Sequence, residues 1–455
     1  MNDKRLISLD RELFPWEKEV LERCGLFLVG GVVRDLLLDK AHPTLDFDYI
    51  VSGIGEEDLL ALLARIGRAD LVGKSFGVIK FKTPEGITVD IALPRSEVST
   101  GPGHRDFKVV SDPDMPVASD LERRDFTVNS MALDLRDSGL VDPLGGVEDL
   151  EKRVLRVNRD TSFVEDPLRI MRGVQFLSRF ELEVEPGTRA LMERDRDLLG
   201  TVSKERIRDE LNKMMLLADR PSAGFVFMHE TGILPLVLPE LDVTWGVEQN
   251  EFHPDDVFYH SVKSCDIAEK ELLIRWCALL HDLGKPMMKM ELNGRTVFHR
   301  HEEESARLAG EILTRLMFPA SFISSAKHLI SHHMFMITDE WSDSAVRRFV
   351  ARVGTENIDD LFEIRKADGA SRGDRRIGEE VEYSRNRIDK VIRAESAFKR
   401  SDLALTGTEV MEIAGIEPGP HVGEILDDLL EAVLDHPEYN TREKLEELIG
   451  ERKRA

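Results

Sequence analysis

Strand-like segments occur only in the first third of this 455-residue sequence. Strands are predicted for TLDFDYIV (44–51), GVIKFKT (77–83) and ITVDIALPR (87–95), which are rich in β-branched residues and bounded by Gly or Pro. The segment EEDLLALLARIG between them has helical spacing of its apolar residues, and from about Ser162 onward nearly all spacing is helical. This distribution predicts an α+β domain, a mixed sheet with helices, followed by an all-α region.

The helical part is expected to divide further. The stretch Pro235–Asp256 contains three prolines and no clear period, as is typical of a junction. The residues after this stretch are rich in histidine, and the C-terminal residues form charged helical patterns with an internal turn, AGIEPGPHVG. We therefore predict four regions: an α+β region at 1–150, a helical region at 151–250, a histidine-rich helical region at 251–375 and a helical tail at 376–455.

The composition excludes several classes of protein. A formal net charge of −24 argues against a simple nucleic-acid coat protein, so any nucleic-acid contact must be local. The three cysteines are scattered and suggest neither a disulfide framework nor a cysteine zinc site. The N-terminus has no apolar signal-peptide region and no run of about 20 apolar residues exists, so we expect no membrane contact and a cytoplasmic location.

Two carboxylates stand one residue apart in a predicted strand. Side chains alternate along a strand, so Asp46 and Asp48 point to the same face. Like charges that close repel each other unless a cation or a proton lies between them. A bare D-x-D pair is also found on the solvated face of an edge strand, so the neighbouring residues must decide.

The neighbouring residues favour a metal-dependent site. Gly30 and Gly31 lie between a predicted strand and helix, where a phosphate can approach the backbone, and Arg34 follows. A third carboxylate, Asp90, lies on a later strand. Two or three carboxylates near a triphosphate can hold two Mg²⁺ ions, one activating a 3′-hydroxyl and one supporting the pyrophosphate that leaves.

Five segments in order resemble a known family. They are LVGGVVRDLLL, DFDYIV, LERRDFTVNSMA, DPLGGVEDL and VEDPLRIMRGVQFLSRF. The sequence in this respect resembles bacterial tRNA nucleotidyltransferases (CCA-adding enzymes) and poly(A) polymerases of class II, with a polymerase-β-like fold, over residues 26–240. The resemblance implies a head domain (1–150), a nucleotide-recognition and RNA-binding neck (151–250) and a C-terminal tail (376–455).

The resemblance also implies roles for individual residues. It assigns metal ligation to Asp46 and Asp48, triphosphate contact to Gly31 and Arg34, and nucleotide contact to Arg124 with support from Asp125 and Asn129. The alternative for Arg123, Arg124 and Asp125 is a cluster of surface ion pairs.

Asp166 and Arg169 are candidates for reading the base. They stand three residues apart on a predicted helix, with Arg172 one step further. A carboxylate accepts from the amino group of C or A and a guanidinium donates to the ring nitrogen, whereas both contacts fail with G and U. Each failed contact costs ~1–3 kcal/mol. The family uses its E-D-x-x-R motif in this way; the alternative is an ordinary helix ion pair.

Two features bear on the product. The family often carries an Arg three residues beyond Arg172, where this sequence has Gln175, so either Arg172 suffices for the phosphates or nucleotide affinity is altered. Residues 91–122 lack a regular pattern and resemble the flexible loop of enzymes that add all of CCA. This argues against addition of CC alone but leaves CCA addition, A addition and poly(A) synthesis open.

The histidine-rich region predicts a second metal site. His260, His281, Asp282 and Asp368 fit the H…HD…D pattern, which resembles the HD phosphohydrolase domain, and His301 and His332 are candidate further ligands. Imidazole and carboxylate suit Ni²⁺, Mn²⁺ or Co²⁺. Such a metal can activate water to cleave a phosphomonoester or a 2′,3′-cyclic phosphate. The alternative is an HD scaffold without activity.

Our leading hypothesis is therefore an enzyme that adds CMP and AMP from CTP and ATP to the 3′ end of tRNA without a template, with Mg²⁺ as cofactor. An A-adding enzyme or a poly(A) polymerase is the nearest alternative. A metal phosphohydrolase whose N-terminal half only binds RNA is the alternative from another class. The sequence indicates nothing about the oligomeric state.

Overall fold

The computed structural model describes residues 9, 11–38, 47–72, 77–99, 107–250, 253–394 and 397–452. The chain forms two compact units, one of residues 1–214 and 223–237 and the other of residues 215–222 and 238–455. One boundary, between Val237 and Leu238, falls inside the predicted proline-containing junction. The first unit thus includes both the predicted α+β region and most of the helical region that follows it.

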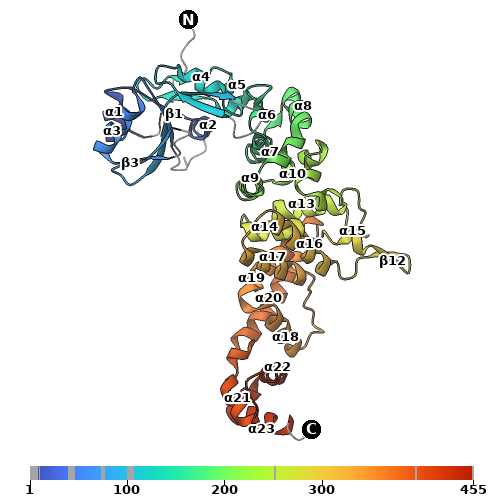
Figure 1. Ribbon diagram of the computed structural model, residues 1–455. Helices are drawn as coiled ribbons and strands as arrows, with labels where there is room; N and C mark the ends of the chain where they lie inside the picture. The colour runs from blue at the N-terminus through green and yellow to red at the C-terminus, as the bar shows by residue number, and fades with distance from the viewer. Residues whose placement is uncertain are drawn as a thin grey trace. The chain divides into compact units, whose positions relative to one another are not determined.

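Seven of the described strands form one mixed sheet in the first unit, in the order β3-β4-β5-β2-β1-β8-β9. Figure 1 shows this sheet with β1 and β3 labelled. These strands are β1 (Gly25–Val29), β2 (Asp48–Ser52), β3 (Arg68–Val72), β4 (Val78–Lys82), β5 (Thr88–Ala92), β8 (Ala132–Asp134) and β9 (Leu140–Val141). Strand β2 pairs antiparallel with β1 and parallel with β5. The segments predicted as strands at 44–51, 77–83 and 87–95 contain β2, β4 and β5, although residues 44–46 lie outside the described residues.

The predicted loop at 91–122 contains a hairpin instead of being wholly irregular. Strands β6 (Arg95–Ser99) and β7 (Phe107–Ser111) pair antiparallel, and a helix, α4 (Val117–Glu122), follows. Residues 100–106 between these strands lie outside the described residues. The sequence prediction of an irregular loop was therefore wrong for both flanks of this segment.

Helices alternate with the strands of the sheet, and the rest of the first unit after β9 is mainly helical. The first described helix begins at Pro15, where a proline suits the first helical turn. The helices of this part are α1 (Pro15–Leu21), α2 (Gly31–Leu37), α3 (Glu56–Ile66), α5 (Gly146–Glu151), α6 (Ser162–Glu165), α7 (Leu168–Phe180), α8 (Pro186–Asp195), α9 (Lys204–Leu217), α10 (Ser222–Glu230) and α11 (Leu234–Val237). Two short strands, β10 (Val154–Leu155) and β11 (Glu183–Val184), pair parallel between them.

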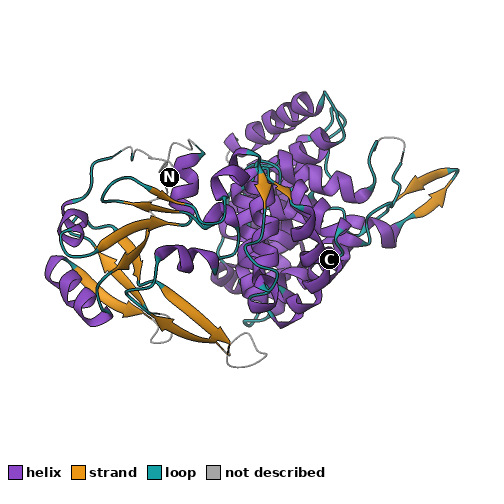
Figure 2. Cartoon of the chain, turned by 90° about the horizontal axis from the view of Figure 1, so that it is seen from above, coloured by secondary structure: helices purple, strands orange, loops and turns teal. Residues whose placement is uncertain are grey.

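Among its described residues, the second unit is helical except for one hairpin, β12 (Met290–Leu292) with β13 (Arg295–Val297), which projects from the helices in Figure 2. Its helices are α12 (Pro239–Asp242), α13 (Val257–Ile267), α14 (Leu272–Leu280), α15 (Lys285–Met288), α16 (His301–Arg315), α17 (Ala320–His332), α18 (Asp343–Val353), α19 (Ile358–Ser371), α20 (Ile377–Arg393), α21 (Gly407–Ala414), α22 (Pro420–Asp435) and α23 (Arg442–Arg452). The prediction of an all-α C-terminal region is confirmed apart from this hairpin. Within the described residues, every helix is too short or too polar to span a bilayer.

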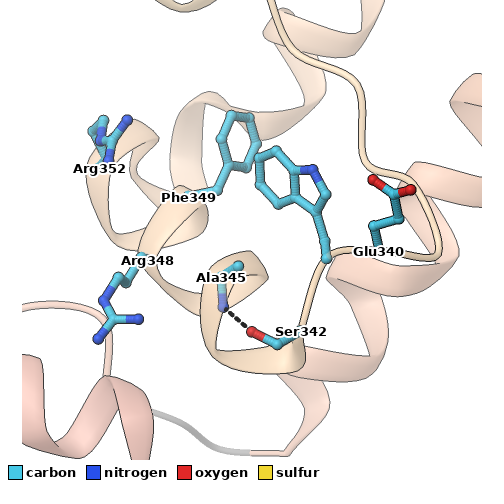
Figure 3. A pocket seen from close by; sticks show the side chains of 7 residues that line it. Glu340, Ser342, Ala345, Arg348, Phe349 and Arg352 are labelled. Atoms are coloured by element: carbon cyan, nitrogen blue, oxygen red, sulfur yellow. Dashed lines mark hydrogen bonds between the residues drawn. The ribbon is translucent and has the colours of Figure 1, made fainter.

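Arginines of α18 hold the C-terminal end of α22. Arg347 donates to the carbonyl oxygens of Leu434 and Asp435 at 2.6 and 3.0 Å, which caps carbonyl groups that a helix end leaves unpaired. Arg348 pairs with Glu431 and Asp435. A shallow pocket lies over the start of α18, where Ser342 caps the helix by accepting from the Ala345 N–H (Figure 3). Its Arg348 is already paired, so we assign this pocket a packing role only.

Candidate functional sites

The first candidate site forms where β1 ends and α2 begins. Gly30 has φ +74° and ψ −131°, a conformation that residues with a side chain rarely adopt. A Cβ atom at this position would lie 3.1 Å from Nη1 of Arg124 and 3.9 Å from Oδ2 of Asp48. The structure therefore brings the glycine turn, a predicted nucleotide ligand and a predicted metal ligand to one place, as the sequence suggested.

Strand pairing explains why two of the predicted carboxylates are neighbours. Asp48 opens β2 opposite Val29, the residue before the Gly30 turn, and it is opposite Asp90 in the parallel pair with β5. Paired residues of neighbouring strands share one face of a sheet, so both carboxylates face the same side. Asp48 is exposed, and Asp90 is partly exposed and lies 3.1 Å from the ammonium of Lys80. The third predicted carboxylate, Asp46, lies outside the described residues.

Arg34 is buried, whereas an arginine that binds phosphate at a surface turn would be exposed. Its side chain is 4% exposed, forms hydrogen bonds with Asp35 at 2.8 and 2.9 Å, and donates to Oδ1 of Asn129 at 2.5 Å. The guanidinium also lies 4.0 Å from the ring centre of Phe180, and burial lowers its pKa. Arg34 thus supports the α2 turn from inside, and direct contact of Arg34 with a triphosphate stays a prediction.

Arg124 lies on the segment after α4, and neighbouring residues fix its position. Its guanidinium lies 3.5 Å from Asp120, and Arg123 pairs with the same carboxylate at 2.8 Å. The backbone oxygen of Arg124 accepts from the side-chain amide of Asn158 at 3.0 Å. Since Arg124 remains partly exposed beside Gly30, it can meet a ligand held at the turn.

A buried chain of polar groups links these residues to α7. Asp125 accepts from Arg172 at 2.7 Å and from the amide of Asn129 at 3.3 Å, and Asn129 in turn holds Arg34. Burial alone would raise the pKa of Asp125, but the charge and hydrogen bond of Arg172, together with the Phe126 N–H and the charge of Arg169, lower this pKa. Arg172 is therefore held by Asp125, and its predicted direct contact with the nucleotide stays a prediction.

The predicted base-reading pair is arranged differently from expectation. Asp166 does not lie on a helix with Arg169: it separates α6 from α7, in extended conformation, because a proline follows it. Its Oδ1 accepts from the N–H of Leu168 at 3.2 Å, and Oδ2 lies 3.3 Å from Arg206 of α9. Arg169 donates to the backbone oxygen of Arg123 at 3.0 Å.

Gln175, the departure from the family pattern, is buried inside the first unit. It lies on α7 with 2% of its surface exposed. A side chain at this depth contributes to packing, so we expect the phosphates to be met by other residues.

The second candidate site is a buried cluster of histidines and aspartates in the second unit. His260 of α13, His281 and Asp282 after α14, and Asp368 of α19 converge as the sequence predicted. Nε2 of His260 lies 3.1 Å from Asp282 and 3.3 Å from Asp368, and Nε2 of His281 lies 3.1 Å from Asp282. All four residues are 5% exposed or less. These residues can hold a transition metal, because imidazole nitrogen and carboxylate oxygen are its usual ligands.

Charges around the cluster keep its carboxylates ionised. Burial would raise the pKa of Asp282, but His281 and the Lys285 ammonium, 2.6 Å away, hold this pKa well below its usual range. Asp368 pairs with Arg365 at 2.8 Å and lies 3.4 Å from Arg372. An ionised carboxylate is the form that binds a metal ion.

One predicted extra ligand is wrong and three participants were missed. His332 is bound to the backbone oxygen of His328 in its own helix, and it is the next residue, His333, that joins Asp282 and His301. Burial lowers the pKa of His333 to about 3, so its imidazole stays neutral as a metal ligand must. His253 and Lys285 also belong to the cluster. The HDLGK segment contained Lys285, but no local pattern distinguished His333 from His332.

Comparison with known proteins agrees with this fold. Residues 26–156 match the family model of the poly A polymerase head domain, residues 181–244 that of a probable RNA and SrmB-binding site of polymerase A, and residues 298–449 that of tRNA nucleotidyltransferase domain 2. The crystal structure of the Bacillus stearothermophilus CCA-adding enzyme in complex with CTP has a TM-score of 0.69 at 22% identity, covering 97% of this chain and 98% of that one. The Thermotoga maritima CCA-adding enzyme complexed with tRNA has a TM-score of 0.57 at 22% identity, covering 99% of each chain.

The mixed sheet, its paired carboxylates and the glycine turn, together with the match to the poly A polymerase head domain, define a nucleotidyltransferase. An A-adding tRNA nucleotidyltransferase of Deinococcus radiodurans is 34% identical over 424 residues, covering 90% of this chain and 91% of the relative. A multifunctional CCA protein of Xanthomonas campestris pv. campestris is 35% identical over 419 residues, covering 88% of this chain and 96% of the relative. The chain belongs to the family of tRNA nucleotidyltransferases and poly(A) polymerases. The resemblance of residues 251–375 to the HD domain stays a prediction.

Proposed function

We propose that this protein adds CMP and AMP from CTP and ATP to the 3′ end of tRNA without a template. The observation that carries the proposal is the juxtaposition of Asp48, Asp90 and Arg124 around the Gly30 turn. The names of the relatives support tRNA as the acceptor. In this proposal residues 1–150 act as the head, 151–250 as the neck and 376–455 as the tail, and the enzyme works in the cytoplasm.

Different residues of the site bind the metal, the triphosphate and the base. Mg²⁺ held by Asp48 and Asp90, with Asp46, would supply charge neutralisation and activate the 3′-hydroxyl. The turn at Gly30 and Gly31 presents backbone N–H groups at the start of α2, where an anion such as a triphosphate is favoured. Arg124 supplies a cation beside this turn, and Asp166 with Arg169 reads the edge of the base.

The product of the reaction should be tested first, because the names of two relatives indicate different products. One is an A-adding enzyme and the other a multifunctional CCA protein. Purified protein should be incubated with Mg²⁺, CTP and ATP and either tRNA ending at the discriminator base or tRNA ending in CC. We expect addition of CCA to the first and of A to the second. Extension of the second alone indicates an A-adding enzyme, a long A tail indicates a poly(A) polymerase, and no extension of either overturns the proposal.

Substitution of Gly30 tests the phosphate turn. Gly30→Ala places a methyl group in a strained conformation and 3.1 Å from Arg124, whereas Gly53→Ala imposes positive φ (+79°) with no atom within 4 Å of the new Cβ. We expect each variant to lose ~1–3 kcal/mol of unfolding free energy. Only Gly30→Ala should raise the KM for both CTP and ATP. Equal KM values in the two variants would show that the turn does not hold the nucleotide.

A second activity is supported by the cluster in the second unit. We propose that His260, His281, Asp282 and Asp368 hold a divalent transition metal, and that the protein hydrolyses phosphomonoesters or 2′,3′-cyclic phosphates at this site. A metal bound there would lower the pKa of a bound water and so provide a nucleophile at neutral pH. Lys285, Arg365 and Arg372 surround these carboxylates and can balance the negative charge of a phosphate ester.

This second site should operate independently of nucleotide addition. His281→Ala or Asp282→Ala is expected to remove hydrolysis of p-nitrophenyl phosphate and of 2′,3′-cyclic AMP while CTP incorporation continues. His332→Ala is the matched control, because this neighbouring histidine binds its own helix. If the unmodified protein hydrolyses neither compound with Ni²⁺, Mn²⁺, Co²⁺ or Mg²⁺, the cluster is a scaffold without this activity.

A further inference from the structure

Asn158 lies outside the sequence motifs described above, yet its side chain contacts three groups beside the predicted nucleotide site. Its Nδ2 lies 3.2 Å from the backbone oxygen of Leu121, 3.0 Å from that of Arg124 and 2.6 Å from Oγ of Ser130. Carbonyl oxygens only accept hydrogen bonds, so the NH₂ group of the amide must be the side that faces them. Oδ1 of Asn158 is buried and forms no hydrogen bond with any described residue. The side chain therefore serves as a donor.

The backbone of Asn158 and one of its partners add two further connections to the same segment, residues 121–130. The N–H of Asn158 donates to the backbone oxygen of Asp125 at 3.1 Å. Oγ of Ser130, which accepts from Asn158, donates in turn to the backbone oxygen of Phe126 at 2.8 Å. Asn158 thus connects the beginning, the middle and the end of a segment that carries the arginine to which nucleotide contact was assigned.

This segment needs such an anchor, because part of it has no regular structure. Residues 123–125 lie between α4 and the isolated bridge that Phe126 forms with Val157, and they belong to neither a helix nor a strand. Backbone groups in such a stretch have no partners in a helix or a sheet, and leaving them unpaired is costly. Asn158 follows Val157 directly and supplies the missing donors. The backbone conformation around Arg124 therefore depends on Asn158.

The side chain of Arg124 has few contacts of its own. Its Nη2 lies 3.5 Å from Oδ2 of Asp120, whereas Arg123 binds Oδ1 of the same carboxylate at 2.8 and 2.9 Å. Nε of Arg124 is buried and forms no hydrogen bond with any described residue. Nη1 nevertheless lies close to the Gly30 turn. The backbone must therefore contribute much of what keeps this guanidinium at the turn.

We propose that Asn158 is a positioning residue for triphosphate binding. It holds the backbone of residues 121–130 and so keeps the guanidinium of Arg124 beside the Gly30 turn, without touching the nucleotide itself. This inference rests on the proposed function, and in particular on contact between Arg124 and the triphosphate. Because the triphosphate is common to all nucleotides, loss of Asn158 should weaken CTP and ATP alike.

Binding of CTP to the full-length protein with Mg²⁺ and without tRNA measures this effect, with inorganic triphosphate as the competing ligand. Asn158→Asp keeps the size of the side chain but removes its donor, and Asn158→Ala removes the whole amide. We expect each variant to bind both ligands roughly 5–30-fold more weakly, or ~1–2 kcal/mol, the worth of one or two hydrogen bonds. Asn357→Asp is the matched control and should bind CTP normally, since Nδ2 of Asn357 also donates to a backbone oxygen, that of Val353, but in the second unit.

A double-mutant cycle with Arg124→Ala distinguishes positioning from a purely structural role. If Asn158 acts through Arg124, then Asn158→Asp should cause no further loss of affinity for inorganic triphosphate once Arg124 is alanine. Effects that multiply in the double variant would show that Asn158 only stabilises the fold, and they overturn the inference. Thermal unfolding identifies variants that fail to fold, and failure of both Asn158 variants to fold also overturns it.

Two further outcomes separate this inference from the proposed function. If the unmodified protein adds CMP to tRNA but Arg124→Ala binds CTP as tightly as the unmodified protein does, then Arg124 does not meet the triphosphate. That result overturns the role of Asn158 and leaves the proposed function standing. If the unmodified protein adds no nucleotide to tRNA, both are overturned.

Discussion

Asp48→Ala is expected to lower the rate of CTP incorporation roughly 10²–10³-fold while the protein stays folded. A carboxylate that holds Mg²⁺ contributes several kcal/mol to charge stabilisation in the transition state, and each 1.36 kcal/mol is tenfold in rate. Because Asp48 is exposed at the start of β2, its loss should change the free energy of unfolding by no more than ~0.5 kcal/mol. Single-turnover incorporation on tRNA ending at the discriminator base measures the effect.

Asp70→Ala is the matched control for this substitution. Asp70 is an exposed aspartate on β3 of the same sheet, paired with Arg68 instead of facing the Gly30 turn. The Asp70→Ala variant should incorporate CTP at the rate of the unmodified protein. Incorporation by Asp48→Ala within a few-fold of the unmodified protein would exclude Asp48 as a metal ligand.

Asp166→Ala should relax the choice of base. Loss of the carboxylate removes the contact with the amino group of C or A, so GTP and UTP should compete roughly 5–150-fold better in relative kcat/KM, which corresponds to ~1–3 kcal/mol. Each of the four nucleotides would be tested in turn for single incorporation.

Asp209→Ala on α9 is the control for Asp166→Ala, because the exposed carboxylate of Asp209 pairs with the adjacent Arg208. If Asp166→Ala slows all four nucleotides equally and keeps the preference for C and A, then Asp166 only stabilises the start of α7 and the base is read elsewhere. Arg34→Ala is a poor comparison, because removal of a buried, fully bonded guanidinium should also destabilise the fold.

Sequence patterns predicted the features that depend on neighbouring residues. The strand, glycine turn and helix around Gly30 follow from local propensity, and the HDLGK segment marked His281 and Asp282. The proximity of Asp48 to Asp90 depends on strand register, which joins residues about 40 apart in sequence and is set by packing of the sheet.

The errors also have physical causes. Pro167 disfavours helix at the residue before it, so the sequence did contain a signal that Asp166 lies outside α7. His332 and His333 are adjacent at a helix end, and packing against other helices decides which of them faces inward. The β6–β7 hairpin was missed because the glycines and proline between RSEVS and FKVVS favoured a loop.

The division of the chain limits how its parts can be exchanged between relatives. Residues 215–222 belong to the second unit although residues on both sides belong to the first. The buried guanidinium of Arg275 donates to the carbonyl oxygens of Met215 and Ala218 in this segment. A gene fusion with a single crossover at residue 238 would replace this segment with foreign sequence, whose backbone would have to place the same two carbonyl oxygens against the Arg275 guanidinium. Chimaeras within the family should therefore fold more often when residues 215–222 and the C-terminal half come from the same parent protein.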